Sequence, residues 1–497
     1  MTALRFQLAP GQALAFAADP PPNTSPLAHE RLLELYYDTA DLALWRAGWR
    51  LSTRWRTGRW QLRLQGGDLK QPLLWDVQDC AVDCTKLPFK GRLGQTLLEL
   101  LEGQELSLQL RLDGQRQIWE WVLAAGGRGR VTLEQGAVQV ADLHLRFHEL
   151  ALSLPPLADE TRWTALQQLL VPYEAVPSLQ EPVVRGFERL RQAVPAFHKA
   201  QRAELDRGLS IEQAFARIVE SCCRHFLANE EAVRAGDVEG VHQMRVALRR
   251  LRSCLRLFRA LVPRAASAEL VEEIRWLNGL LAAARDWDVF QSEGLQPLRE
   301  HFPKRRGLAM LWRQVEQHRR QCYQRLHQGL ELTRYRRLTL QLWLWLCCRR
   351  WRTGLTAQQY QALQAPLAAF AKAELRRLRR RVRRLGERFD SLDGAQRHRL
   401  RIRIKQLRYA TEFFADLYLA ARSDAFRQAL STLQDHLGAM NDALMTRRLL
   451  DELELAAANA TRALVEGWYG GRMDLQLRDF APYWQAFRDC RPPWKGR

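Results

Sequence analysis

Two basic helical segments of the sequence repeat each other at a fixed distance. The segment "VHQMRVALRRLR" (241–252) aligns with "RHRLRIRIKQLR" (397–408), an offset of 156 residues. The same offset aligns "LLAAARD" (280–286) with "HLGAMND" (436–442), which pairs Asp286 with Asp442. Two separate motifs that agree on one offset indicate an internal duplication. We therefore expect two related helical units, each a four-helix bundle.

The basic side chains of the first copy gather on one side of its helix. At 100° per residue, they fall within about 80° of arc, and the other side is apolar. Like charges one turn apart repel each other, so a face that carries only cations predicts an anionic partner. The row of the first copy is His242, Arg245, Arg249, Arg252 and Arg256. The row of the second copy is His398, Arg401, Lys405 and Arg408.

A third basic helix is predicted at "KAELRRLRRRVRRLGERF" (372–389), with Arg376, Arg380 and Arg383 as its candidate row. Between Lys372 and Arg408 there are 15 Lys or Arg residues and 4 acids. The whole chain has a formal net charge of +21. This excess favours an acidic partner: a nucleic acid, an anionic membrane or a polyphosphate-like polymer.

Several classes of protein are disfavoured by the sequence. The most apolar run, "LTLQLWLWLCC" (338–348), is shorter than the roughly 20 residues that a membrane-spanning helix needs. The N-terminus lacks the pattern of a secretion signal, so we expect a cytoplasmic protein. Nine cysteines without a C-x-x-C motif predict free thiols. Neither His242 nor His398 has a second metal ligand at i,i+4 spacing, so we expect no metal site and no cofactor.

The two halves of the chain differ in the secondary structure that their sequence patterns predict. Up to about residue 190, strand-like segments alternate with Gly-rich turns, and short helices are expected at 28–36 and 164–171. The expected strands are 59–66, 106–112, 118–124 and 143–154. From Ser210 onward the pattern is helical, and Ser210 with Gln213 forms a capping box. The long helical periods that follow are 241–262, 268–284, 308–330, 334–351, 357–385, 395–420, 424–439 and 441–457.

The helical half resembles a CHAD domain, the conserved histidine α-helical domain, over about 205–490. The resemblance rests on four segments: "VHQMRVALRRLRSCLRLF", "WLNGLLAAARDWDVF", "HRLRIRIKQLRYATEFF" and "LQDHLGAMNDALMTRRLLDEL". It implies two four-helix bundles around a strongly basic surface and cavity. It also implies binding of inorganic polyphosphate, often at polyphosphate granules. The residues support this independently, because guanidinium groups form bidentate hydrogen bonds to phosphate oxygens. Polyphosphate carries no nucleobases, so its binding needs no side chains for base recognition.

The N-terminal part, about 1–195, resembles a CYTH domain, the triphosphate-tunnel fold of adenylate cyclases and triphosphatases. The resemblance rests on "YYDTADLALWRAGWRLSTRWRTGRWQLRLQG" (36–66) and "RGFERL" (185–190). It implies Arg54 and Arg63 as phosphate contacts, and it implies metal-binding acids that this chain largely lacks. The positions that depart from the family's acidic or lysine residues are Arg5, Gln7, Gln65, Ala151, Ser153 and Pro182.

Of the late acidic strand only Glu149 remains, and one acid cannot hold a catalytic divalent metal. We therefore predict an α+β chain of two domains: an antiparallel β-barrel or tunnel that is not an enzyme, then the duplicated helical domain. The predicted function is polyphosphate binding, without a specific nucleic acid or a membrane as partner. Two alternatives stay open: a metal-dependent triphosphatase and a non-specific nucleic-acid binder.

Overall fold

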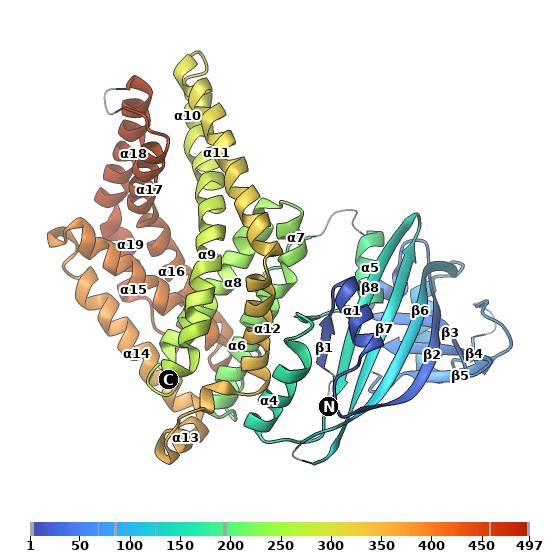
Figure 1. Ribbon diagram of the computed structural model, residues 1–497. Coiled ribbons are helices and arrows are strands. Elements are labelled where there is room, and N and C mark those ends of the chain that lie inside the picture. The colour runs from blue at the N-terminus through green and yellow to red at the C-terminus, as the bar shows by residue number, and fades with distance from the viewer. Residues whose placement is uncertain are drawn as a thin grey trace. The chain divides into compact units, whose positions relative to one another are not determined.

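The computed structural model describes residues 4–67, 69–83, 87–124, 126–191, 196–456 and 459–494. The chain divides into two units, Met1–Ala196 and Phe197–Arg497. The N-terminal unit is built on an antiparallel sheet and the C-terminal unit is helical (Figure 1). The predicted fold class, an antiparallel sheet domain followed by an all-α domain, is therefore confirmed.

The sheet of the N-terminal unit has the strand order β5-β4-β3-β2-β6-β7-β8-β1-β9. Its edge strands β5 and β9 do not pair with each other, so the sheet is not closed within the described residues. The strands are β1 (Leu4–Gln7), β2 (Thr24–Asp38), β3 (Trp49–Arg56), β4 (Arg59–Gly66), β5 (Leu73–Val77), β6 (Ser107–Val122), β7 (Arg128–Val140), β8 (Leu143–Ser153) and β9 (Val176–Pro177).

Two apolar clusters hold helices against this sheet. One contains Val183 and Phe187 of α5, packed with Leu110 of β6 and Val138 of β7. The other contains Leu97 of α3 together with residues of β3 and β4. The helices of the unit are α1 (Pro10–Ala18), α2 (Ala43–Arg46), α3 (Gly91–Leu101), α4 (Asp159–Leu170) and α5 (Pro182–Arg191).

Two sequence-based expectations for this unit are wrong. The segment 28–36, expected as a helix, lies in strand β2, because pairing with β3 and β6 outweighs its local helical pattern. The segments 106–112 and 118–124 belong to one continuous strand, β6, although "DG" between them is typical of a turn. There Gly114 lies opposite Gly136 of β7, and a Cβ at Gly114 would lie 2.1 Å from the Gln135 carbonyl oxygen. The glycine is needed for this close approach of strands.

The helical unit begins with the predicted capping box, in which Ser210 accepts from the Gln213 amide. Its helices follow one another through short connections. They are α6 (Ile211–Ala228), α7 (Glu230–Arg234), α8 (Val238–Leu257), α9 (Ala268–Val289), α10 (Gln296–His301), α11 (Arg306–Glu331), α12 (Thr333–Cys347), α13 (Ala357–Gln364), α14 (Leu367–Gly386), α15 (Gly394–Phe413), α16 (Ala420–His436), α17 (Gly438–Glu452), α18 (Ala460–Arg478) and α19 (Phe480–Asp489).

The duplication predicted from the two motifs is visible in helix boundaries. Helix α8 begins at Val238 and α15 at Gly394, so the starts are 156 residues apart. Both helices have an aspartate N-cap, Asp237 and Asp393, whose carboxylate accepts from a backbone amide. The repeat is less regular further on, since α9 is continuous while its counterpart is divided into α16 and α17.

Two further expectations for the helical unit need correction. The predicted helix 357–385 is two helices, α13 and α14, because Pro366 has no amide hydrogen and stands as the N-cap of α14. Helices α18 and α19 were not among the helices predicted from the sequence, and α18 contains three glycines of low helix propensity, Gly467, Gly470 and Gly471.

In the part of the chain that the structure describes, no helix is both long and apolar enough to cross a bilayer. The described cysteines are all free thiols.

Candidate functional site

The two duplicated helices, α8 and α15, lie against each other in the helical unit. The charges of both basic rows act on Lys405 of α15: Arg401 and Arg408 belong to its own helix, and Arg245 and Arg249 belong to α8. His242 lies at the α8 end of the same group, near Arg245 and Arg249. We call these six residues the central basic cluster: His242, Arg245, Arg249, Arg401, Lys405 and Arg408.

Aspartates of the second duplicated motif stand beside the arginines of the first. Arg245 donates to Asp286 of α9 at 3.0 Å, and Arg448 of α17 donates to the same carboxylate at 2.6 Å. In the second copy, the charge of Asp442 acts on Arg401 and opposes the loss of its proton. The repeated Arg and Asp residues are therefore neighbours in both copies, which explains why the sequence keeps them at one offset.

Packing fixes part of each arginine in the cluster. The guanidinium of Arg249 lies 5.8 Å from the ring centre of Tyr409, and that of Arg408 lies 5.0 Å from the same ring centre. Arg408 also forms a 2.9 Å ion pair with Glu412. The Nε–H groups of Arg249 and Arg401 are buried and have no acceptor among the described residues. Unpaired buried donors are costly, so these two arginines favour an anionic ligand nearby.

The crowding of cations changes the pKa of two members. Burial, and then the charges of Arg401, Arg249, Arg245 and Arg408, lower the pKa of Lys405 to about 7. Burial and the charge of Arg285 lower the pKa of His242 from its usual value. A bound polyanion would oppose both effects, because it stabilises the protonated forms.

The remaining candidate residues are distributed differently. Arg252 lies near Arg256 and Arg275, one turn beyond the central basic cluster. His398 lies one turn before Arg401 on the same flank of α15, half-buried. The three candidate arginines of α14 lie outside the central basic cluster. Arg376 and Arg380 are exposed, and Arg383 pairs with Glu387 at 2.8 Å.

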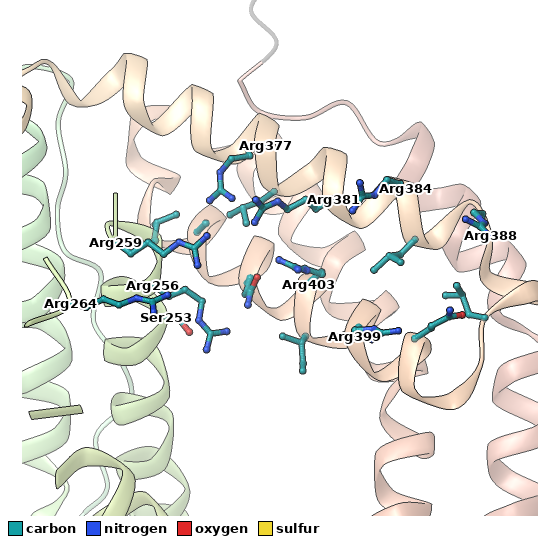
Figure 2. A pocket seen from close by; sticks show the side chains of 18 residues that line it. Ser253, Arg256, Arg259, Arg264, Arg377, Arg381, Arg384, Arg388, Arg399 and Arg403 are labelled. Atoms are coloured by element: carbon teal, nitrogen blue, oxygen red, sulfur yellow. The ribbon is translucent and has the colours of Figure 1, made fainter. Parts of the chain in front are cut away.

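A cavity of about 870 Å³ lies between α14, α15 and the end of α8 (Figure 2). Half of its 18 lining residues are arginines, and none of the lining residues is an acid. We call it the arginine pocket. Its arginines are Arg256, Arg259, Arg264, Arg377, Arg381, Arg384, Arg388, Arg399 and Arg403.

Only Arg256 of these nine was a sequence-based candidate. Helix α14 has arginines on both flanks of its apolar stripe, which includes Leu375, Leu378 and Val382. The sequence cannot tell which flank faces a neighbour, because both lie at similar angles from the stripe. The same ambiguity hides Arg399 and Arg403, which lie on the flank of α15 opposite Lys405. The signal that could have found them is the density of arginine itself.

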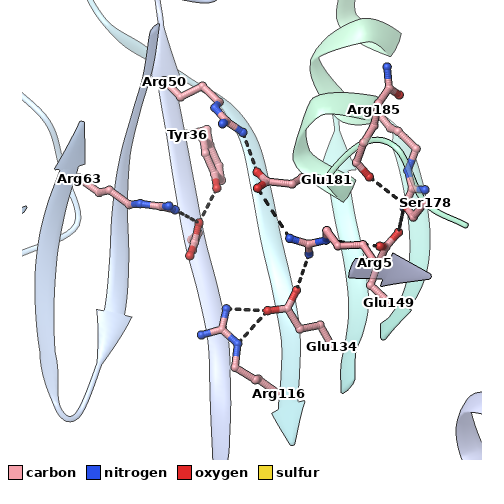
Figure 3. Close-up of polar contacts among 12 residues, drawn as sticks. Arg5, Tyr36, Arg50, Arg63, Arg116, Glu134, Glu149, Ser178, Glu181 and Arg185 are labelled. Carbon is pink, nitrogen blue, oxygen red and sulfur yellow. Dashed lines mark hydrogen bonds and ion pairs between the residues drawn. The ribbon is translucent and has the colours of Figure 1, made fainter. Parts of the chain in front are cut away.

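The interior of the N-terminal sheet carries a different arrangement, in which arginines and glutamates alternate (Figure 3). A row in register crosses the sheet and pairs Glu30 with Arg116, Arg116 with Glu134, and Glu134 with Glu149. Arg116 and Glu134 form a 2.7 Å ion pair. Arg5 lies between the two facing acids, 3.1 Å from Glu134 and 3.8 Å from Glu149. It therefore separates two carboxylates that would otherwise repel each other.

Glu149 and Glu181 are each held by further arginines. Arg185 donates to the fully buried Glu149 at 2.8 Å, and Arg50 donates to Glu181 at 2.7 Å. Burial still raises the pKa of Glu149 above its usual value, although Arg185 and Arg5 oppose the shift. Glu149, the acid singled out from the sequence, is thus a buried ion-pair partner in this structure.

The two expected phosphate contacts of this unit also have partners. Arg63 lies 3.7 Å from Glu34, which accepts a short hydrogen bond from Tyr36. Arg54 donates to Gln61 at 3.1 Å. The sequence analysis missed the other interior acids, Glu30, Glu34, Glu134 and Glu181, because their strand positions alone do not show which arginines they meet. No group of three His, Cys, Asp or Glu residues is arranged to hold a metal ion among the described residues.

Comparison with known proteins identifies the helical unit. The family model of the CHAD domain matches residues 217–451. The solved CHAD domain from the plant Ricinus communis is 31% identical, with a TM-score of 0.51; the match covers 60% of this chain and 98% of that domain. PptA from Streptomyces chartreusis is 18% identical, with a TM-score of 0.40, over 56% of this chain and 99% of PptA.

A candidate adenylate cyclase from Bacillus halodurans is 12% identical to this chain, with a TM-score of 0.24. That match covers 37% of this chain and 95% of the other. No curated protein matches the chain. The match to the plant domain spans nearly all of that domain at 31% identity, and the family model of the same domain also matches this chain. The chain therefore belongs to the CHAD domain family.

Proposed function

We propose that the helical unit binds inorganic polyphosphate through the central basic cluster. The observation that carries the proposal is Lys405, a partly buried ammonium group on which the charges of two arginines from α8 and two from α15 act, namely Arg245, Arg249, Arg401 and Arg408. So many cations at one point repel each other, and a polyanion would remove that repulsion. We also expect the protein to gather at polyphosphate granules in the cell.

The chemistry of the cluster suits a chain of phosphates. Guanidinium groups offer paired donors that match phosphate oxygens, and successive turns of a helix repeat them about every 5–6 Å. Residues of α8 and α15 approach from two sides, so a linear polymer could lie along the seam between the helices. No base recognition is needed, which favours polyphosphate over a nucleic acid as the ligand.

The test is the affinity of the full chain for long-chain polyphosphate at several salt concentrations. Arg249→Ala with Arg401→Ala should weaken binding at least tenfold at low salt. It should also flatten the salt dependence by roughly 0.7 to 0.9 per lost contact, by analogy with nucleic-acid backbones. The matched control is Arg306→Ala with Arg313→Ala, two exposed arginines of α11 whose loss changes the net charge equally.

Equal losses in the two double variants would show that binding follows net charge alone, which would reject a defined cluster. Single-stranded DNA of matched charge serves as competitor. If DNA displaced polyphosphate at equal phosphate concentration, non-specific nucleic-acid binding would be the better description. Circular dichroism shows whether each variant keeps its helices.

For the N-terminal unit we propose a role without triphosphate hydrolysis. The support is the pairing of its interior acids with arginines, which leaves Glu134, Glu149 and Glu181 engaged by cations. Hydrolysis by this route needs a divalent metal held by clustered carboxylates. Phosphate release from triphosphate or ATP is measured with Mg²⁺ or Mn²⁺. Metal-dependent turnover that is abolished by Glu149→Ala would overturn the proposal.

A further inference from the structure

The arginine pocket has a shape that differs from the seam between α8 and α15. Arg377 and Arg381 reach into it from α14, Arg399 and Arg403 from α15, and Arg256 from α8 (Figure 2). The cations thus converge from three helices on one volume rather than following one line. Its volume of about 870 Å³ lies in the range of small-molecule sites.

The charges in the pocket are poorly balanced by the protein. Burial, and then the charges of Arg377, Arg403 and Arg259, lower the pKa of Arg381 from its usual value. The charge of Glu374 opposes this shift, and Glu374 pairs with Arg377. Arginines of this kind are normally paired with acids in the interior or spread apart on the surface. Because these arginines lie together with few acids, an external anion could supply the missing negative charge.

The pocket has no equivalent in the first copy of the duplication. At an offset of 156 residues, Arg399 corresponds to Gln243 and Arg403 to Ala247, which is buried. The seam is built by residues that the two copies share, whereas Arg399 and Arg403 of the pocket have no basic counterpart in the first copy. The duplication therefore does not account for the pocket arginines, which indicates a separate role.

We infer that the arginine pocket binds a compact, multiply phosphorylated anion, at a site distinct from the central basic cluster. Such a ligand presents phosphates in several directions at once, as the pocket presents guanidinium groups from three sides. Two sources share this chemistry: a polyphosphorylated ring such as inositol hexakisphosphate, and a short inorganic chain such as triphosphate. The inference does not depend on binding of long polyphosphate at the seam.

The test uses the full chain and calorimetric titration with inositol hexakisphosphate and, separately, with inorganic triphosphate. Arg381→Ala with Arg403→Ala should weaken binding of the responsive anion at least tenfold. The control, Arg306→Ala with Arg313→Ala, removes the same charge from exposed positions of α11 and should change it less than twofold. Arg381→Lys with Arg403→Lys keeps the charge and should give an intermediate loss, because lysine lacks the bidentate fork.

If the pocket variant lost affinity for inositol hexakisphosphate alone, the ligand would be ring-like. If it lost affinity for triphosphate to the same extent, a short phosphate chain would also fit the pocket. Either result supports the pocket. Absence of binding of both anions to the unchanged protein would overturn it, as would equal losses in the pocket and control variants. Long polyphosphate titrated against Arg249→Ala with Arg401→Ala tests the seam independently, so failure at one site is distinguishable from failure at the other.

Discussion

The interior of the N-terminal sheet and the arginine pocket of the helical unit use arginine in different ways. In the N-terminal sheet, Arg5, Arg50, Arg116 and Arg185 each lie within 4 Å of a glutamate. In the helical unit, the arginine pocket is lined by nine arginines and no acid. The number of arginines is therefore a poor guide to anion binding. What decides it is whether the fold supplies the counter-charge.

The difference follows from the geometry of the two kinds of element. In an antiparallel sheet, side chains directly opposite each other are close, so an acid on one strand neutralises an arginine on the next. The row from Glu30 through Arg116 to Glu134 is built in this way. On a helix, neighbours are three or four residues apart in one segment, and α14 and α15 have mostly arginine at those spacings.

The largest expected difference between the two units is the stabilisation of the helical unit by bound polyphosphate. At a concentration of 100 times its Kd, polyphosphate should stabilise the helical unit by up to about 2.7 kcal/mol, less any binding to the unfolded chain. The N-terminal unit should gain nothing. Hydrogen exchange should therefore slow in α8 and α15 but not in β6 and β7. Equal protection of the strands would show that the two units do not differ in polyphosphate binding.

The next prediction concerns a variant in which arginines of the N-terminal sheet lose their glutamate partners. Glu134→Gln with Glu181→Gln removes the principal partners of Arg5, Arg50 and Arg116. We expect the N-terminal unit to gain triphosphate affinity of at least tenfold, seen as one additional site per chain by calorimetry, because the freed guanidinium groups are already oriented inward. It should also lose stability, mainly through Glu134, since breaking a buried pair costs about 3–5 kcal/mol, whereas Glu181 is partly exposed and its pair is screened by solvent.

The control for this gain is Glu99→Gln with Glu102→Gln, which removes the same charge from exposed positions on α3 and just after it. If the control gained an equal site, the effect would be one of net charge. If neither variant gained a site while the sheet stayed folded, the interior network would not be a blocked anion site at all.

These arrangements show where the sequence is informative and where it is not. The repeated offset predicted the helical duplication, because equivalent residues in two copies occupy equivalent places, and the structure adds that Arg245 of the first motif pairs with Asp286 of the second. The arginine pocket could not be predicted, since Arg377 and Arg376 are adjacent and only packing shows which of them faces α15. In the sheet, the partners of Arg5 come from β7, β8 and the loop before α5, far apart in sequence.

A smaller effect is expected from the acid inside the basic cluster. Asp286 holds Arg245 and Arg448, so it is a local version of the pairing in the sheet. Asp286→Asn should raise polyphosphate affinity about fivefold at low salt, because one repelling charge worth about 1 kcal/mol is removed. Glu269→Gln, an exposed acid of the same helix, is the control and should change affinity less than twofold. A loss of affinity in Asp286→Asn would show that holding Arg245 in place matters more than its neutralisation.

The smallest effect concerns pH and Lys405. Its pKa is lowered to about 7 by burial and by Arg401 and Arg408 of its own helix together with Arg249 and Arg245 of α8. The charged form binds phosphate, so affinity should fall about threefold as pH rises from 6 to 8.5, with uptake of a proton on binding near pH 8. Stability has the opposite sign. A lysine whose pKa is lower in the folded state destabilises the fold while it is protonated, and this cost is relieved as pH rises from about 7 toward the unfolded value near 10.4.

Lys405→Arg separates these effects, because arginine stays protonated over the whole range. Polyphosphate affinity of this variant should lose the decrease between pH 6 and 8.5, and its unfolding free energy should no longer rise with pH over the range in which Lys405 titrates. His242 titrates below its usual range, so it cannot replace Lys405 in this window. If Lys405→Arg kept the full pH dependence, the titrating group would lie elsewhere. The crowding of cations around Lys405 would then lack its most direct electrostatic signature.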